Sequence, residues 1–127
     1  MDIRRQNPIV EQYHFDMKQP EQEVETSLNV GFMPMDPPDD EYPKENSIIG
    51  ARLEFTIVFP EFVLSGAVGQ INHIVNKQIH SADDISREDA DELVLPLFDI
   101  VKRLTYEVTE IITDQPGIEL NFNAQEN

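Results

Sequence analysis

The sequence predicts an α+β fold in which a four-stranded antiparallel sheet is covered by one long helix. Apolar and polar residues alternate through most of residues 9–75, which is the period of half-buried strands. Later apolar residues recur at spacings of three and four, which is the period of an amphipathic helix. With 127 residues, 39% of them hydrophobic, the chain can form one core. We therefore expect a single domain over residues 1–122 and a disordered tail over residues 123–127.

The first two strands are expected at residues 9–15 and 23–32. The stretch "IVEQYHF" is rich in β-branched and aromatic side chains and ends before a polar break at Pro20. The stretch "EVETSLNVGF" alternates strictly, and its apolar face carries Val24, Thr26, Leu28, Val30 and Phe32. This pattern is typical of an antiparallel strand with one face on a core.

A long loop is expected at residues 33–46, "MPMDPPDDEYPKEN", because its four prolines cannot donate to a continuous backbone ladder. Met33, Met35 and Tyr42 place apolar side chains on this acidic loop. Methionine adapts to varied surfaces, so the loop could cover a groove or contact a partner. Alternatively, these side chains fold back onto the sheet.

Residues 48–59, "IIGARLEFTIVF", form the clearest predicted strand, since apolar side chains occupy every second position from Ile49 to Phe59. Pro60 and Glu61 follow as a turn. A fourth strand begins at residue 62, and its two glycines suggest a bulge or bend between residues 66 and 69.

Pro96 lies within the helical apolar pattern of "LVLPLFDIVKRL", although a proline inside a helix costs about 3 kcal/mol or more. Ser86, with Asp89 three residues later, is a helix N-cap signal ahead of that proline. We predict a short helical piece from Ser86 and a main helix with Pro96 in its first turn. A kinked continuous helix is the alternative. The expected apolar face carries Leu97, Ile100, Val101, Leu104, Val108, Ile111 and Ile112.

"DQPGIELNF" is expected to end the helix at Pro116 and Gly117 and to continue as a short extended segment. Its alternate apolar residues are Ile118, Leu120 and Phe122.

The formal net charge of −16 argues against a nucleic-acid partner, because the field would repel phosphates. It favours encounters with basic or unfolded cationic segments, or it simply keeps the protein in solution. The chain has no cysteine, which excludes disulfides and thiolate metal sites. We find no apolar signal sequence and no run long enough for membrane insertion, so we expect a cytoplasmic protein.

Candidate chemistry is sparse. His14, His73 and His80 lack the spacing that places two imidazoles on one helical face, so we expect no metal site. The acidic run 39–41 lacks the alternating ligands and glycine of a calcium loop. No nucleotide-binding or nucleophile motif occurs. We therefore expect no catalytic residues, no cofactor and no enzymatic activity.

The stretch "LVLPLFDIVKRLTYEVTEIITDQPGIELNF" resembles the region of SecB, the bacterial export chaperone, where a helix leads into a short "LxLxPVNF" segment. "YHFD" at residues 13–16, followed by "QP" and an alternating strand, is similar to the first SecB strand, its crossover and its second strand. The whole chain looks even more like an uncharacterised family of small cytosolic Gram-positive bacterial proteins with a SecB-like fold. SecB continues with a second helix that helps to wall its peptide groove, whereas this sequence stops five residues after Phe122.

The resemblance implies a non-enzymatic, chaperone-like homo-oligomer, a dimer or tetramer, that binds non-native polypeptides. Its candidate polypeptide-binding residues are Phe32, Met33, Met35 and Tyr42. Its candidate oligomer interface comprises Leu97, Val101, Leu104 and Val108. The alternative is an oligomeric scaffold or adaptor for one folded partner, in which the apolar strips are only core and subunit interface.

Overall fold

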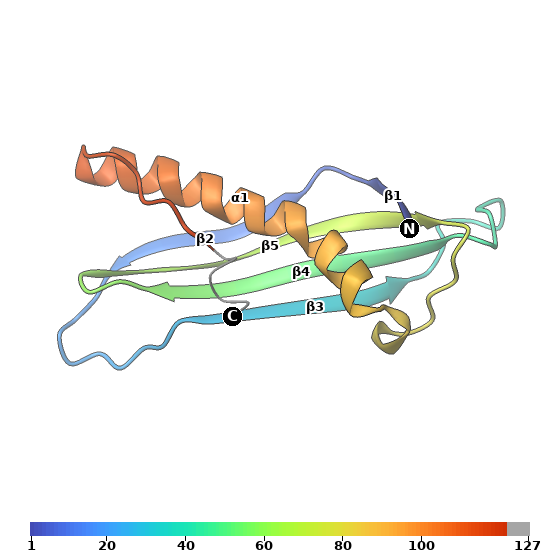
Figure 1. Ribbon diagram of the computed structural model, residues 1–127, viewed down its shortest axis with the longest axis horizontal. Helices are drawn as coiled ribbons and strands as arrows, with labels where there is room; N and C mark the ends of the chain where they lie inside the picture. The colour runs from blue at the N-terminus through green and yellow to red at the C-terminus, as the bar shows by residue number, and fades with distance from the viewer. Residues whose placement is uncertain (122–127) are drawn as a thin grey trace.

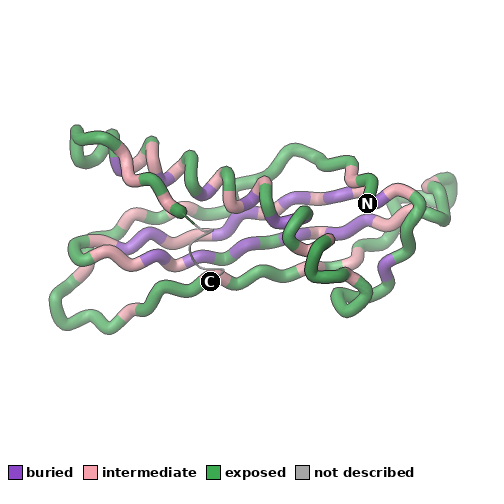
Figure 2. Tube along the Cα trace, in the orientation of Figure 1, coloured by how far each residue is buried: buried purple, intermediate pink, exposed green. Residues whose placement is uncertain are grey.

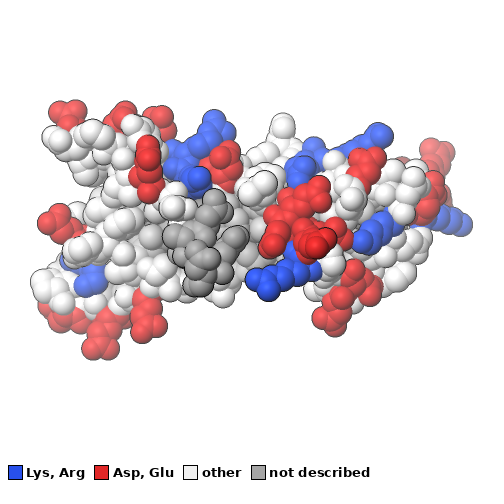
Figure 3. All heavy atoms as spheres, viewed as in Figure 1, with Lys and Arg blue, Asp and Glu red and all other residues white. Residues whose placement is uncertain are grey.

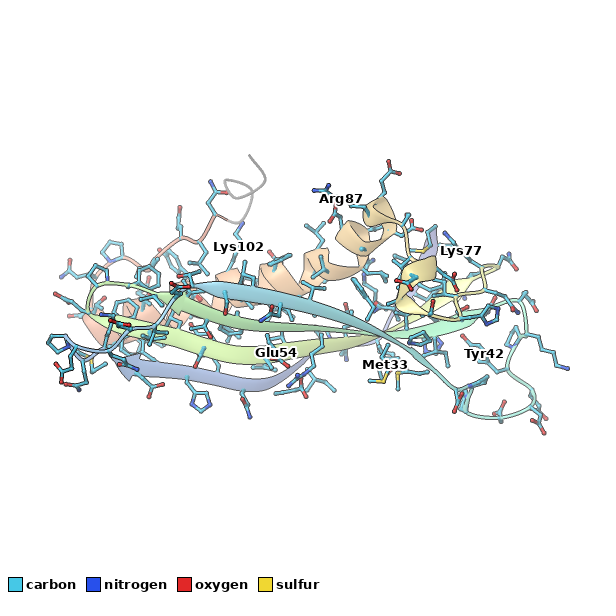
Figure 4. All side chains as sticks on the ribbon, turned by 90° about the horizontal axis from the view of Figure 1, so that it is seen from below. Met33, Tyr42, Glu54, Lys77, Arg87 and Lys102 are labelled. Atoms are coloured by element: carbon cyan, nitrogen blue, oxygen red, sulfur yellow. The ribbon has the colours of Figure 1, made fainter. Side chains whose placement is uncertain are left out.

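The computed structural model describes residues 1–121 and contains one antiparallel sheet, one long helix and one short 3₁₀ helix (Figure 1). The elements in chain order are β1 (Asp2–Arg5), β2 (Ile9–Met17), β3 (Ser27–Met35), β4 (Ser47–Val58), β5 (Phe62–Val75), η1 (Ala82–Asp84) and α1 (Arg87–Thr113). The helix crosses one face of the sheet diagonally and leaves the other face without a cover among these residues (Figures 1 and 4). The predicted α+β architecture is confirmed.

The sheet has five strands rather than the four predicted. β5 pairs with β4 along one side, and with both β1 and β2 along the other. The additional strand is β1, whose Ile3 lies opposite Ile74. Its sequence, "DIRR", is too short and too polar to show alternation, so only its pairing with the end of β5 reveals it.

β3 begins and ends later than predicted. It runs from Ser27 to Met35 rather than over residues 23–32, so Met33 and Pro34 belong to the strand and not to the loop. Pro34 is tolerated because β3 is an edge strand, paired only with β4 among residues 1–121. Just before β3, the hydroxyl of Thr26 accepts a hydrogen bond from the Val58 amide at 3.0 Å.

The core lies between α1 and the inner face of the sheet, the face that α1 covers. The main cluster contains Ala51, Leu53, Phe55, Ile57, Leu64, Val68, Val94, Leu97 and Val101. A second cluster, Ile49, Ile74, Ile79 and Leu93, lies beneath the first half of α1. Burial is concentrated in β4, β5 and the inner side of the helix, whereas β2 and β3 are mostly exposed (Figure 2).

The expected bulge exists, but the extra residue is in β2. The β2–β5 register shifts between Val10 and Gln12, which leaves Glu11 outside the pairing. Opposite this region, Gly66 allows a close approach, because a Cβ there would lie 2.1 Å from the Gln12 carbonyl oxygen.

Pro96 does not begin the main helix, which corrects the prediction. α1 is continuous from Arg87, as the alternative proposed, and Ser86 is its N-cap, accepting a hydrogen bond from the Asp89 amide at 3.2 Å. Pro96 cannot donate to the Glu92 carbonyl one turn earlier. The Arg5 guanidinium of β1 donates to that carbonyl instead, at 2.8 Å. A long-range contact thus satisfies the acceptor that the proline leaves unpaired.

The helix ends at Thr113, and Asp114 adopts a left-handed conformation with φ of 54°. The chain then returns along the helix, where the Ile118 amide donates to the Thr109 hydroxyl at 2.8 Å and Leu120 packs against the main cluster. The expected extended segment forms no strand up to residue 121. Phe122 and the predicted tail lie outside the described residues.

Candidate functional site

The outer face of the sheet, opposite α1, contains a hollow of about 610 Å³. Apolar side chains form much of its wall, including Ile9 from β2 and Met33 from β3, which are 61% and 67% exposed. Figure 4 views the sheet from its β3 edge and shows Met33 and Glu54 on the side away from α1. Apolar groups are therefore presented to solvent on a strand face that polar residues would normally occupy.

Three glycines explain why the face is hollow at this point. Gly31 and Gly69 lie on either side of Arg52 in the β3–β4–β5 register, and Gly50 is opposite Met33. All three line the hollow, and none has a side chain to fill it. A Cβ at Gly31 would meet nothing within 4 Å, so the space above this glycine is open.

A charged group borders the hollow. Arg52 pairs with Glu11 through a 2.8 Å contact between Nε and Oε2, and it also pairs with Glu54. The hydrogen bond with Glu11 is the main cause that raises the pKa of Arg52 above its ordinary value. Glu11 comes from the β2 bulge, so the irregularity in β2 supplies one wall of the site.

The structure places three of the four candidate polypeptide-binding residues on the outer face, Met33 in the hollow described above and Met35 and Tyr42 in a neighbouring one. Met33 and Met35 both point to the outer face, since a Cβ on Gly50 would contact the Met35 sulfur at 3.4 Å. Tyr42 lies beside Met35, over His73 of β5. Phe32 points to the inner face and packs against both core clusters, so it does not join this surface.

Tyr42 is held by His73 on the outer face. Its hydroxyl lies 2.9 Å from His73 Nδ1, and the other ring nitrogen lies 3.0 Å from Gln6 Nε2. Because the Gln6 amide nitrogen can only donate, His73 Nε2 accepts and Nδ1 donates to the Tyr42 hydroxyl. The acidic loop is thus held against the sheet beside Met35. For Tyr42, this is the alternative given above, in which the side chain folds back onto the sheet.

The four candidate interface residues of α1 separate into two pairs. Leu97 and Val101 are fully buried against the sheet and cannot contact another subunit while the core is intact. Leu104 and Val108 are half-buried and lie on a different side of the helix.

The second half of α1 faces the sheet with threonines rather than with the expected apolar residues. Thr105 and Thr109 are fully buried, and the Thr105 hydroxyl lies 3.0 Å from the Tyr13 hydroxyl. Burial raises the pKa of Tyr13, and the hydrogen bond with Thr105 opposes this rise. Ile111 and Ile112, which the sequence placed on the same apolar face, are exposed near the end of α1.

A second hollow, of about 430 Å³, lies between α1 and the start of β2. Val10, Ile100 and Leu104 supply its apolar lining, and Arg103 and Glu107 lie at its border. Leu104 is therefore the candidate interface residue that is best placed to meet another chain.

Within residues 1–121 no three histidine, aspartate or glutamate side chains are grouped to hold a metal ion. His14 lies on β2, His73 on β5 and His80 in the segment before η1. The same residues include no helix that is long and apolar enough to cross a membrane.

The sequence reasoning missed Ile9 and the glycines of the outer hollow. Each glycine was visible as a break in an alternating stretch, and that break is the only signal they offer. Their alignment depends on the register of three strands, which the sequence does not display.

A family model described as "Protein of unknown function (DUF1149)" matches residues 1–122. The chain belongs to this family. No curated protein matches it.

Two solved structures are similar to the chain. A crystal structure of a protein of unknown function from Streptococcus agalactiae is 38% identical, with a TM-score of 0.88, over 96% of this chain and 98% of that one. A SecB-like chaperone from Mycobacterium tuberculosis, solved in complex with a ChAD peptide from the HigA1 antitoxin, is 10% identical. Its TM-score is 0.54, over 94% of this chain and 90% of that one. The suspected SecB-like fold is confirmed.

Proposed function

We propose that this protein is a non-enzymatic, cytoplasmic homo-oligomer that binds extended or non-native polypeptides at the outer face of its sheet. The observation that carries the proposal is the apolar hollow, where Met33 and Ile9 are exposed beside a floor of glycines. Apolar surface that is bordered by charged residues is one mark of a binding groove. The SecB-like fold supports the same function, because the similar mycobacterial chaperone was solved with a bound peptide.

The chemistry of the hollow suits varied partners. Methionine side chains are flexible and polarisable, so they adjust to different apolar groups. Arg52, Glu11 and Glu54 already neutralise one another in part, and they leave the apolar floor open between them. The net charge of −16 attracts segments that carry basic residues.

The test is light scattering from a chemically unfolded, aggregation-prone protein, diluted with and without this protein. We expect suppression at near-stoichiometric amounts. Replacing both Met33 and Met35 with serine should weaken it, because the change removes exposed apolar surface and no core contact. The matched control replaces Ile111 and Ile112 with serine, which removes exposed apolar surface at the far end of α1.

Full suppression by the Met33 and Met35 variant would contradict the placement of the site. No suppression by the folded wild-type oligomer would favour the alternative function, a scaffold or adaptor for one folded partner.

Self-association is proposed at the hollow between α1 and β2. Leu104→Asp should reduce the mass in solution, since an unpaired charge in an apolar contact is costly. Leu95→Asp is the matched control, because Leu95 is on the same helix and 66% exposed. An unchanged mass for Leu104→Asp would place the subunit interface elsewhere.

A further inference from the structure

The free edge of β3 is a long row of main-chain groups without a strand partner. β3 has nine residues and pairs only with β4 among residues 1–121. Edge strands of this length are templates for another strand unless something protects them.

Two contacts show which main-chain groups of β3 bond to β4 and which point away from the sheet. The Val58 amide reaches the Thr26 hydroxyl on the β3 side, whereas the Ile49 carbonyl accepts from Asn72 on the β5 side. Main-chain groups alternate sides along a strand, so even-numbered residues of β4 bond to β3. Their partners are the odd-numbered residues of β3. The N–H and C=O groups of Leu28, Val30 and Phe32 therefore point away from the sheet.

The usual protections are almost absent from this edge. The sequence of β3, "SLNVGFMPM", contains no charged residue. By contrast, β2 on the opposite side of the sheet carries Glu11 and Asp16 and has a bulge. Two features protect the C-terminal part of β3: Pro34 has no amide hydrogen to offer, and η1 lies against the strand.

Apolar side chains lie on both faces beside this edge, although the outer face also carries Ser27 and Asn29. On the outer face, a strand added next to β3 would lie alongside Met33 and Gly31 at the margin of the hollow. On the inner face it would meet Val30, which is 41% exposed, and Leu28. An extended segment with apolar side chains at successive positions fits both faces.

Carboxylates stand beyond both ends of the uncharged edge. Glu23 and Glu25 precede β3, and Asp36, Asp39 and Asp40 follow it, all of them exposed. Figure 3 shows acidic side chains at the lower left and at the right-hand end of the molecule. In an antiparallel pairing with a second copy, the acidic residues before one β3 would lie against those after the other. Like charges destabilise such a pairing, so the edge favours a different chain with basic residues at its ends.

We propose that the β3 edge binds an extended polypeptide segment as an added strand, through main-chain hydrogen bonds to Leu28, Val30 and Phe32. The segment has an apolar centre and basic ends. This inference rests on the proposed function and specifies how the polypeptide is bound. Strand addition gives affinity through the main chain, so it tolerates many side-chain sequences.

The test measures binding of a fluorescent peptide of alternating valine and threonine with lysines at each end. Val30→Pro removes one outward amide hydrogen from the edge without removing a hydrogen bond to β4. Val30→Thr is the matched control, because it keeps the β-branched shape and the amide hydrogen. We expect Val30→Pro to weaken binding about tenfold and Val30→Thr to leave it unchanged.

A second form of the peptide is methylated at its central amides, so it lacks main-chain donors there. Its binding is measured with the wild-type protein, and the result does not depend on the folding of any variant. We expect it to bind at least about tenfold more weakly than the unmethylated peptide. Equal binding of both peptides would overturn strand addition.

The same measurements distinguish a failure of strand addition from a failure of the proposed function. If both peptides bind equally, but the Met33 and Met35 variant binds weakly, the outer hollow binds polypeptide and the edge does not. If the folded protein binds neither peptide and suppresses no aggregation, both proposals are overturned. A drop in the mass of the protein caused by Val30→Pro alone would mean that a second copy occupies the edge, which also overturns the inference.

Discussion

The two faces of the sheet are built from the same strands but are packed differently. In β4, Leu53 and Phe55 are buried under α1, whereas Arg52 and Glu54 alternate with them and line the outer hollow. The inner face is filled by packed apolar side chains, and the outer face is hollowed by glycines. The inner face should therefore determine stability, and the outer face should be available for binding.

The largest difference is expected between Leu97→Ala and Met33→Ala. Leu97 is fully buried, so its truncation should cost about 2–5 kcal/mol in free energy of unfolding. Met33 is largely exposed, so its truncation should cost less than about 0.5 kcal/mol. Urea unfolding measures both, and similar costs for the two variants would contradict the division between the faces.

Two glycines provide a matched comparison of the faces. Gly66→Ala should destabilise by about 1–3 kcal/mol, because the new methyl group would collide with the Gln12 backbone. Gly31→Ala enters open space and should change stability by less than about 0.5 kcal/mol. Thermal unfolding of both variants would distinguish them. Equal melting temperatures would show that the close approach at Gly66 relaxes without cost.

The contact between Arg5 and the Glu92 carbonyl should contribute about 1 kcal/mol. Arg5→Met removes it and leaves the exposed carbonyl to solvent. In a Pro96→Ala background the introduced alanine can donate to the same carbonyl, so Arg5→Met should cost much less. A double-mutant cycle by urea unfolding measures this coupling, and additive costs would mean that Arg5 acts independently of the proline.

The smallest effect is expected at Asp89, near the start of α1. The hydrogen bond from Lys77, at 2.7 Å, is the main cause that lowers the pKa of Asp89. A lowered pKa in the folded state stabilises the protein above the ordinary carboxyl pKa, near about pH 4, and this contribution is lost as the pH falls through the folded value. Asp89→Asn should therefore cost less than about 1 kcal/mol at neutral pH and nothing in strong acid. A cost that grows toward acid would contradict this assignment.

The alternating sequence was sufficient to predict the inner face. β4 was found within one residue at each end, and its buried residues from Ile49 to Ile57 are those of the predicted face. Periodicity reports which side of a strand is buried, and burial here is continuous.

The features that the sequence did not reveal depend on contacts between distant segments. Pro96 is accommodated inside α1 because Arg5, ninety-one positions earlier in the sequence, supplies the missing donor. The outer hollow exists because Gly31 and Gly69 align across Arg52. The buried threonines of α1 depend on Tyr13 of β2. None of these partners is specified by local pattern.

The measurement that tests the account most directly is the effect of Gly31→Leu on both stability and aggregation suppression. The leucine side chain would project into the outer hollow without meeting any atom near the Cβ, so the urea midpoint should stay unchanged while suppression is reduced. Ser27→Leu is the control, because Ser27 lies on the same strand and the same face but outside the hollow. Undiminished suppression by a stable Gly31→Leu protein would contradict the claim that polypeptides bind at the outer face.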